Sequence, residues 1–264
     1  MISFTLFLTL FASGLLEIFI PIILAFWVGS KLGAKWSVFF IGAAMWITAF
    51  VVRLPINDFA TAWVYNNFYT VARATYIYLS IAIPSLTAGI FEEGARWLAF
   101  RFAIKDHKME NGIMYGAGHG GIESMLLVGL SVLATAIVTY FYPGTLTTVQ
   151  LNAIAVTPEW MVLVGVWERL AAISFHLGMS VLILQSFRQK QTYLVGVAVA
   201  SHFFLNFTAV YAGQWGVIAS ETVTTVWGLV ALWYVWTTWK SYKADMGPTL
   251  VSQVPESPAP PNPI

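Results

Sequence analysis

Long, continuously apolar segments constrain this chain more than any other feature of its sequence. Several of them reach the roughly 20 residues that an α-helix needs to cross the hydrocarbon core of a bilayer. Only 9% of the 264 residues are charged and 58% are hydrophobic, whereas soluble domains carry about 25% charged residues. Because the apolar runs are continuous, without the alternation of barrel strands, they favour helices. The sequence therefore predicts an all-α integral membrane protein.

About seven transmembrane helices account for the apolar runs. They are expected at residues 3–28, 36–53, 74–104, 111–141, 158–186, 192–211 and 217–239. Residues 54–72 are rich in aromatic side chains, including Trp63 and Tyr65, and such side chains gather at membrane–water interfaces. We therefore interpret this segment as an interfacial loop and not as part of a span.

Basic residues predict the orientation of the spans, because short cytoplasmic loops carry an excess of Lys and Arg. Nine basic residues fall on one side of the predicted membrane, and only Arg53 and Arg73 fall on the other. The nine are Lys31, Lys35, Arg101, Lys105, Lys108, Arg188, Lys190, Lys240 and Lys243. The N-terminus is therefore expected outside and the C-terminus in the cytoplasm.

One polytopic domain is expected over residues 1–243, with a catalytic-like core at about 74–211. Residues 244–264 are rich in proline, which predicts a disordered cytoplasmic tail. The chain contains no cysteine, which excludes disulfides, thiolate nucleophiles and cysteine-ligated zinc. The net charge of +1 and the lack of a basic cluster give no reason to expect a nucleic-acid partner. The expected surroundings are the lipid bilayer of a bacterial cell membrane.

Polar and ionisable residues lie inside four of the predicted spans. They are Glu92, Glu93, Arg96, His119, Glu123, His176, His202 and Asn206. Charged groups at membrane depth are costly and mark cavities, pairs or functional sites. Counted at about 1.5 Å of rise per residue, the first polar group on each span lies about 14–20 Å from the cytoplasmic end of its helix. The four spans are therefore expected to form one polar layer, nearer the cytoplasmic face.

The first group is the adjacent pair Glu92 and Glu93, with Arg96 one turn further on. Two neighbouring carboxylates in a low dielectric cannot both ionise cheaply. One of them can stay ionised beside Arg96, while the other serves as a general base for water. The alternative is a structural salt bridge that joins helices.

The second group sets His119 and Glu123 one turn apart among four glycines. Glycines remove side-chain bulk and allow a neighbouring helix or a substrate to approach closely. His119 can hold a water or donate to an oxyanion, and Glu123 can orient it. The alternative is a packing face with a hydrogen bond between helices.

The third group places His202 and Asn206 on one helix face, where Asn206 suits an oxyanion partner or an orienter of histidine. Polar contacts between spans are the alternative. His176 has no acidic residue four positions on, so we assign it a supporting role.

Three other charged residues within spans are interpreted as structural. Glu168 and Arg169 are adjacent and can form a self-satisfied ion pair. Glu17 is an isolated carboxylate in the first span, and we expect it to bond to another helix.

Together these motifs resemble the YhfC-type branch of the CAAX-protease and bacteriocin-processing superfamily of intramembrane glutamic proteases. Glu92, Glu93 and Arg96 match the family's Glu pair followed by a basic residue, with a spacing closer to the PrsW proteases than to the CAAX proteases. His119 resembles the histidine of the second polar helix. The last motif, His-x-x-x-Asn, is matched by His202 and Asn206.

The leading hypothesis, which the resemblance supports, is a glutamic-type intramembrane peptidase. One of Glu92 and Glu93 would deprotonate a water held with His119. His202 and Asn206 would stabilise the oxyanion, with Arg96, Glu123 and His176 in support. The family's chemistry implies no metal and no cofactor. The substrate would be a membrane-embedded or lipidated peptide, cut in the cytoplasmic half of the bilayer.

Two alternatives remain open from the residues alone. His119, His176, His202 and a glutamate could form a zinc shell, although no His-Glu-x-x-His motif is present. A proton-coupled transporter or a non-catalytic scaffold would also bury carboxylates. The oligomeric state is not predicted by any of these features.

Overall fold

A computed structural model describes residues 2–246, and this part of the chain is helical with no β-strand. The α-helices are α1 (Phe4–Leu32), α2 (Trp36–Phe68), α3 (Arg73–Leu98), α4 (Met109–Glu123), α5 (Leu130–Phe141), α6 (Thr148–Ala155), α7 (Glu159–Arg188), α8 (Tyr193–Ala212) and α9 (Val217–Met246). Two π-helical segments, η1 (Ala99–Ala103) and η2 (Ser124–Gly129), extend α3 and join α4 to α5. Two short 3₁₀ segments are η3 (Pro143–Thr145) and η4 (Gly213–Trp215). Most of the predicted Pro-rich tail lies outside the described residues.

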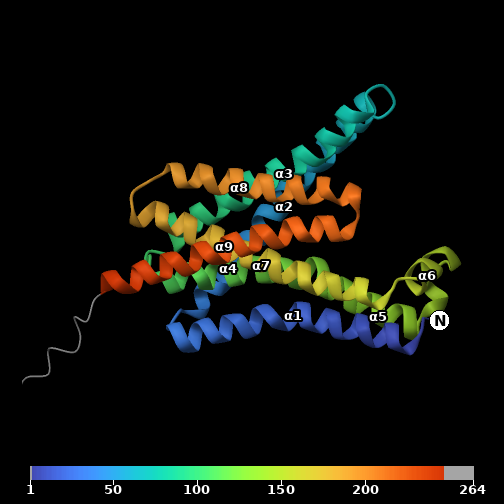
Figure 1. The fold of residues 1–264 in the computed structure, drawn as a ribbon, viewed down its shortest axis with the longest axis horizontal. Helices are drawn as coiled ribbons and strands as arrows, with labels where there is room; N and C mark the ends of the chain where they lie inside the picture. Colours follow the sequence, from blue (N-terminus) through green and yellow to red (C-terminus); the bar gives the residue numbers. More distant parts are fainter. Residues whose placement is uncertain (1, 247–264) are drawn as a thin grey trace, which may run out of the picture.

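Seven helical segments are long and apolar enough to cross a membrane, which confirms the all-α fold class and the number of spans. The long helices lie roughly side by side along the long axis of the molecule (Figure 1). At one end, α3 connects to α4 and α7 to α8, close to Lys105, Lys108, Arg188 and Lys190; we call this the basic end. At the opposite end, α7 begins, α8 ends and α9 begins.

The prediction of an interfacial loop at residues 54–72 is wrong, because α2 continues without a break to Phe68. That prediction rested on the aromatic residues of the segment, and Pro55 lies within the helix. Proline is tolerated within membrane helices where neighbouring groups compensate for the lost hydrogen bond. Here Thr87 of α3 donates a hydrogen bond of 2.7 Å to the side chain of Asn57, which ties the two helices together beyond Pro55.

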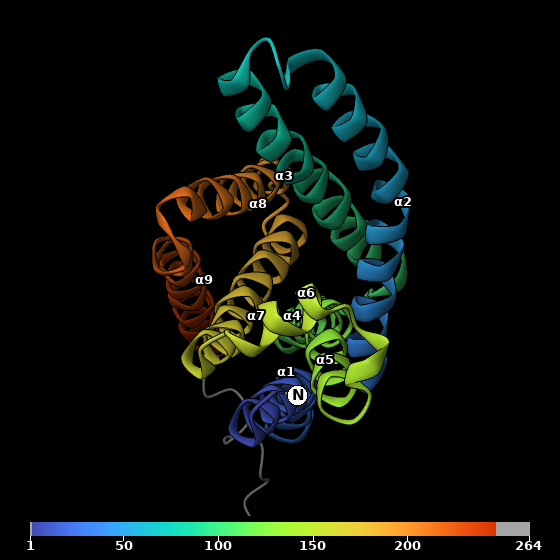
Figure 2. The ribbon, with the colours of Figure 1, turned by 90° about the vertical axis from the view of Figure 1, so that its right-hand side faces the viewer.

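The α2–α3 pair forms a long hairpin that projects from the rest of the bundle (Figure 2). Stacked and edge-on contacts among Tyr65, Tyr69 and Tyr76 hold its tip together. Arg73 lies over the rings of Tyr69 and Tyr76, at 4.8 and 5.0 Å from the ring centroids. The aromatic residues that suggested an interface therefore stabilise a helical hairpin.

The glycine-rich helix α4 lies between α2 and α7 and packs closely against both. A Cβ atom on Gly118 would lie only 2.0 Å from the carbonyl oxygen of Phe39 in α2. On the other side, a Cβ atom on Gly120 would lie 2.9 Å from the Cβ of His176 in α7. The close approach predicted for these glycines is confirmed, and it is what brings His176 to the helix that carries His119.

The largest apolar core fills the half of the bundle toward the basic end. Phe100, Met114, Tyr115, Ile183 and Leu184 are all fully buried there. The second half of α7 is buried without interruption from Phe175 to Ser186. A membrane helix that is buried all round lies inside the bundle, away from lipid, so α7 forms the centre of the fold.

Candidate active site

Six of the predicted polar residues meet at one place in the middle of the bundle. We call them the central cluster: Glu92, Glu93, Arg96, His119, His176 and His202. Helix α3 supplies the two glutamates and the arginine, and α4, α7 and α8 supply one histidine each. All six side chains are buried. The helices therefore converge as the shared depth of these residues predicted.

Glu92 and Glu93 are adjacent in the sequence but have different surroundings. The carboxylate of Glu92 accepts a hydrogen bond from Arg53 at 3.1 Å through Oε1. Its Oε2 atom lies 3.3 Å from Nε2 of His119 and 3.8 Å from Nε2 of His202. One oxygen of Glu92 is thus held by a cation, and the other faces two imidazoles.

Glu93 is fully buried and bound on both sides. It forms an ion pair with Arg96, one turn further along α3. Its Oε1 atom also lies 2.8 Å from Nδ1 of His202. A carboxylate on one ring nitrogen fixes the orientation of an imidazole and leaves the other nitrogen to face the site. Glu93 and Arg96 therefore aim Nε2 of His202 toward Glu92.

His176 lies at the centre of the cluster, although the sequence gave it only a supporting role. Its Nδ1 atom lies 3.1 Å from a guanidinium nitrogen of Arg96, and its Nε2 atom lies 3.0 Å from Glu123. The prediction that Glu123 orients His119 is wrong. Glu123 points toward α2 and α7, where Trp46 and Arg169 each donate to it at 3.1 Å.

Arg53 and Arg169 form ion pairs with carboxylates of the site. The sequence did not assign either arginine to the site. Arg53 was placed at the outer end of the second span, and this placement is wrong because Arg53 lies in the middle of α2, beside Glu92. Arg169 forms the predicted ion pair with Glu168 but also binds Glu123. A longer second span would have placed Arg53 inside the membrane, where a charge signals a buried partner.

A cavity of about 180 Å³ lies against the central cluster. We call it the polar cavity; its lining is Arg53, Glu92, Glu123, Glu168, Arg169, Ala172, His176, His202, Leu205, Asn206, Ala209, Val210, Ser220 and Thr224. Asn206 lies in this lining one turn beyond His202. Of the two adjacent glutamates, the cavity reaches Glu92 and not Glu93. Glu92 is therefore the carboxylate that a substrate or a water can approach.

The prediction that the side chain of Glu17 bonds to another helix is wrong. It is buried, and neither carboxylate oxygen has a hydrogen-bond partner among the residues that the structure describes. Its neighbours include Gly129 and Gly165, which offer no side-chain donor. Only its backbone carbonyl is bonded across helices, to the hydroxyl of Ser124 at 2.9 Å.

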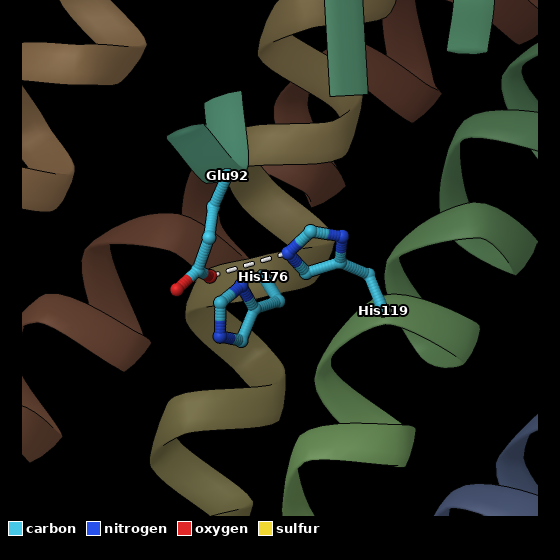
Figure 3. A group of neighbouring side chains, drawn as sticks. All are labelled: Glu92, His119 and His176. Atoms are coloured by element: carbon cyan, nitrogen blue, oxygen red, sulfur yellow. Dashed lines mark hydrogen bonds and ion pairs between the residues drawn. The ribbon is translucent and has the colours of Figure 1, made fainter. Parts of the chain in front are cut away.

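Three members of the central cluster also have the geometry of a metal site. The side chains of Glu92, His119 and His176 point toward one another (Figure 3), and one donor atom from each lies within 4.8 Å of the others. One carboxylate and two imidazoles are a donor set that catalytic zinc uses in proteins. These residues therefore fit a divalent metal such as zinc.

A helical membrane bundle with buried glutamate, histidine and arginine around a cavity fits an enzyme that works within the bilayer. The chain belongs to the YhfC intramembrane metalloprotease family, whose profile matches residues 16–227. It is 30% identical over 214 residues to a Bacillus subtilis (strain 168) protein, the uncharacterized membrane protein YhfC, covering 75% of this chain and 81% of that protein. No solved structure matches the chain significantly.

The family defines the chain as an intramembrane endopeptidase, a hydrolase, and as a multi-pass protein of a bacterial cell membrane. The transporter and scaffold alternatives are set aside on this ground. The wider kinship with the CAAX and PrsW proteases, and the orientation of the termini, stay predictions.

Proposed function

We propose that this protein hydrolyses a peptide bond of a membrane-embedded substrate at the central cluster, by glutamic-type chemistry with Glu92 as the base. One observation carries the proposal: Glu92 Oε2 faces two histidine nitrogens at 3.3 and 3.8 Å and borders the polar cavity. A buried carboxylate that borders a cavity can bind a water there, beside the imidazoles, and accept its proton.

The reaction then follows from the positions of these groups. Glu92 takes a proton from the water, and the oxygen attacks the carbonyl carbon of the substrate. His202 sits between the carboxylates of Glu92 and Glu93, which favour its doubly protonated form. In that form Nδ1 donates to Glu93, while Nε2 and the amide of Asn206 donate to the oxyanion that develops on the carbonyl oxygen. When the carbon–nitrogen bond breaks, Glu92 returns the proton to the leaving amine, which yields a carboxylic acid and a free amine.

Arginine pairing supports a role for Glu92 without a metal. Arg53 pairs with Glu92, Arg96 with Glu93 and Arg169 with Glu123. Glu92 and Glu93 thus each have a guanidinium of their own, whereas Glu123 shares Arg169 with Glu168. These pairings make the charges tolerable at membrane depth. Both ring nitrogens of His176 are also engaged, by Arg96 and Glu123.

Metal-dependent hydrolysis is the second candidate, favoured by the convergence of Glu92, His119 and His176 and by the description of the family. These three side chains would hold the ion. A bound zinc ion would polarise the substrate carbonyl and lower the pKa of water. The carboxylate of Glu123 on His176 would then orient a ligand, as carboxylates commonly do behind metal-bound histidines.

The test of the proposal is cleavage of membrane peptides by the full chain in lipid vesicles. A panel of transmembrane peptides is reconstituted with the protein, and new amino termini are detected by mass spectrometry. Glu92→Gln should lower the cleavage rate by about 10²–10⁴-fold, the range for loss of a general base, while the protein stays folded. Glu159→Gln, at an exposed position in the first turn of α7, is the matched control. A Glu92→Gln protein as active as the control would exclude Glu92 as the base.

The same preparation separates the two candidates. Glutamic-type chemistry requires cleavage to survive exhaustive chelation, in protein without stoichiometric metal. One zinc per chain, lost together with activity in His176→Ala and on chelation and restored by added zinc, would favour the metal-dependent mechanism.

A further inference from the structure

The polar cavity extends from the central cluster toward one end of the bundle only. On α8 its lining runs from His202 through Asn206 to Val210, away from the basic end. On α7 it runs back from His176 to Glu168, toward the start of that helix. At about 1.5 Å of rise per residue, each run covers about 12 Å. Along both helices the cavity therefore extends toward the end of the bundle where α8 connects to α9 (Figure 1).

Helix α9 forms the third wall of the polar cavity, and its residues independently show that the cavity extends away from the basic end. Helix α9 contributes Ser220 and Thr224, which belong to its first two turns. Exposure also rises along the lining of α8, from 3% at His202 to 57% at Val210. The cavity thus runs from a buried inner end to a more exposed outer end.

Toward the basic end, the central cluster is closed by packing. Residues 111–121 of α4 and 175–186 of α7 are buried without interruption. Tyr115 and Phe100 fill the space beneath the cluster, and both are fully buried. Close-packed interiors leave few voids larger than a water molecule, so this half of the bundle offers no route for a peptide.

We propose that water and the scissile segment of the substrate reach the central cluster from the end opposite the basic loops, between α7, α8 and the start of α9. The inference rests on the proposed peptidase function for what enters, but the route is a property of the fold. The substrate is then a membrane protein whose scissile segment enters from that side of the bilayer. With the predicted orientation, this is the extracytoplasmic side, in contrast to cleavage in the cytoplasmic half.

The walls suit an unwound peptide. A segment that loses its helix within a membrane must satisfy its backbone N–H and C=O groups. The side chain of Asn206 offers both a donor and an acceptor along the lining. Glu168 and Glu123 share the guanidinium of Arg169, and Glu92 is paired with Arg53. Each carboxylate of the lining therefore has a basic partner within the protein.

The absence of cysteine from the chain makes the route directly measurable. Single cysteines are placed in the full chain at Ala209 and Thr224 in the cavity, and at Met114 in the packed half. Thr145→Cys and Gln191→Cys mark the two ends, because both positions are exposed in loops on opposite faces. Oriented vesicles are then treated from either side with a small charged thiol reagent that does not cross membranes.

The expected result is that Ala209→Cys and Thr224→Cys react from the same side as Thr145→Cys, at least ten-fold faster than from the side of Gln191→Cys. Met114→Cys should react from neither side. Reaction of the cavity positions only from the Gln191 side, or from neither side, overturns the route.

A second readout tests whether the substrate uses the same path. Attaching a bulky thiol reagent to Ala209→Cys should reduce peptide cleavage at least ten-fold relative to the unlabelled form of the same variant. Unchanged cleavage after complete labelling overturns substrate access by this route. If no peptide is cleaved by any form of the protein, the proposed function fails, while the labelling pattern still decides how water reaches the cluster.

Discussion

The two halves of the bundle on either side of the central cluster differ in the residues that fill them. Toward the basic end, glycines and large apolar side chains pack α2, α4 and α7 against one another, and residues 111–121 of α4 and 175–186 of α7 are buried throughout. Toward the opposite end, the same helices carry arginines, glutamates and a polar cavity. In the proposed mechanism, the packed half holds the catalytic groups in place, and the cavity half lets reactants reach them. Substitutions should therefore reduce stability in the first half and activity in the second.

The largest effect is expected for the ion pair at the boundary of the packed half. Glu93→Gln leaves Arg96 buried without a compensating charge, and breaking one side of a buried pair costs about 3–5 kcal/mol. The free energy of unfolding, measured by denaturant titration in micelles, should fall accordingly. The double variant Glu93→Gln, Arg96→Gln removes both charges and should recover part of this loss but no activity. A double variant no more stable than Glu93→Gln would show that the pair is not the cause.

In the cavity half, a substitution is expected to lower the rate of peptide cleavage more than the stability of the fold. Asn206→Ala removes a proposed oxyanion donor, a loss that lowers kcat by about 10²–10³-fold. Unfolding should be little affected, because Asn206 lines the cavity and is only partly buried. Single-turnover cleavage of a vesicle-bound peptide measures the chemical step. If KM rises while kcat is unchanged, Asn206 binds substrate and does not stabilise the transition state.

The two halves also differed in how far the sequence could predict them. The seven spans and the convergence of Glu92, His119 and His202 follow from hydrophobic length and from charges at one depth, because both are local properties of the chain. The partners of Glu123 and the position of Arg53 could not be predicted. They depend on which way α2 and α7 face, and helix rotation is set by packing against neighbours.

Glycine spacing was the one local signal of that packing. The glycines around His119 predicted a close neighbour without identifying it. The structure shows two, because Gly118 faces Phe39 and Gly120 faces His176. Rotation about the axis of α7 is fixed by this contact, and with it the central place of His176, which its sequence surroundings alone did not indicate.

Close packing at Gly118 gives the next prediction. A methyl group there would meet the carbonyl oxygen of Phe39, so Gly118→Ala should destabilise the fold by about 1–3 kcal/mol, the usual cost of overpacking. Gly196→Ala in α8 is the matched control, since nothing lies within 4 Å of its added Cβ. In a helix, that change should be neutral or stabilising by up to about 1 kcal/mol. Equal stability of the two variants would contradict the tight α2–α4 contact.

The smallest change in stability is expected for a substitution of Glu17. It tests whether every buried carboxyl group of this protein contributes to the active site. Its carboxylate lies outside the central cluster and has no partner within residues 2–246. Replacing an unsatisfied buried polar group by an apolar one of similar shape removes its desolvation cost, so Glu17→Met should stabilise the protein by about 1 kcal/mol. Thermal unfolding in micelles measures the change, and peptide cleavage should be unaffected. A loss of stability or of cleavage would instead mean that Glu17 has a partner in the working enzyme, and that the polar network extends from α7 to α1.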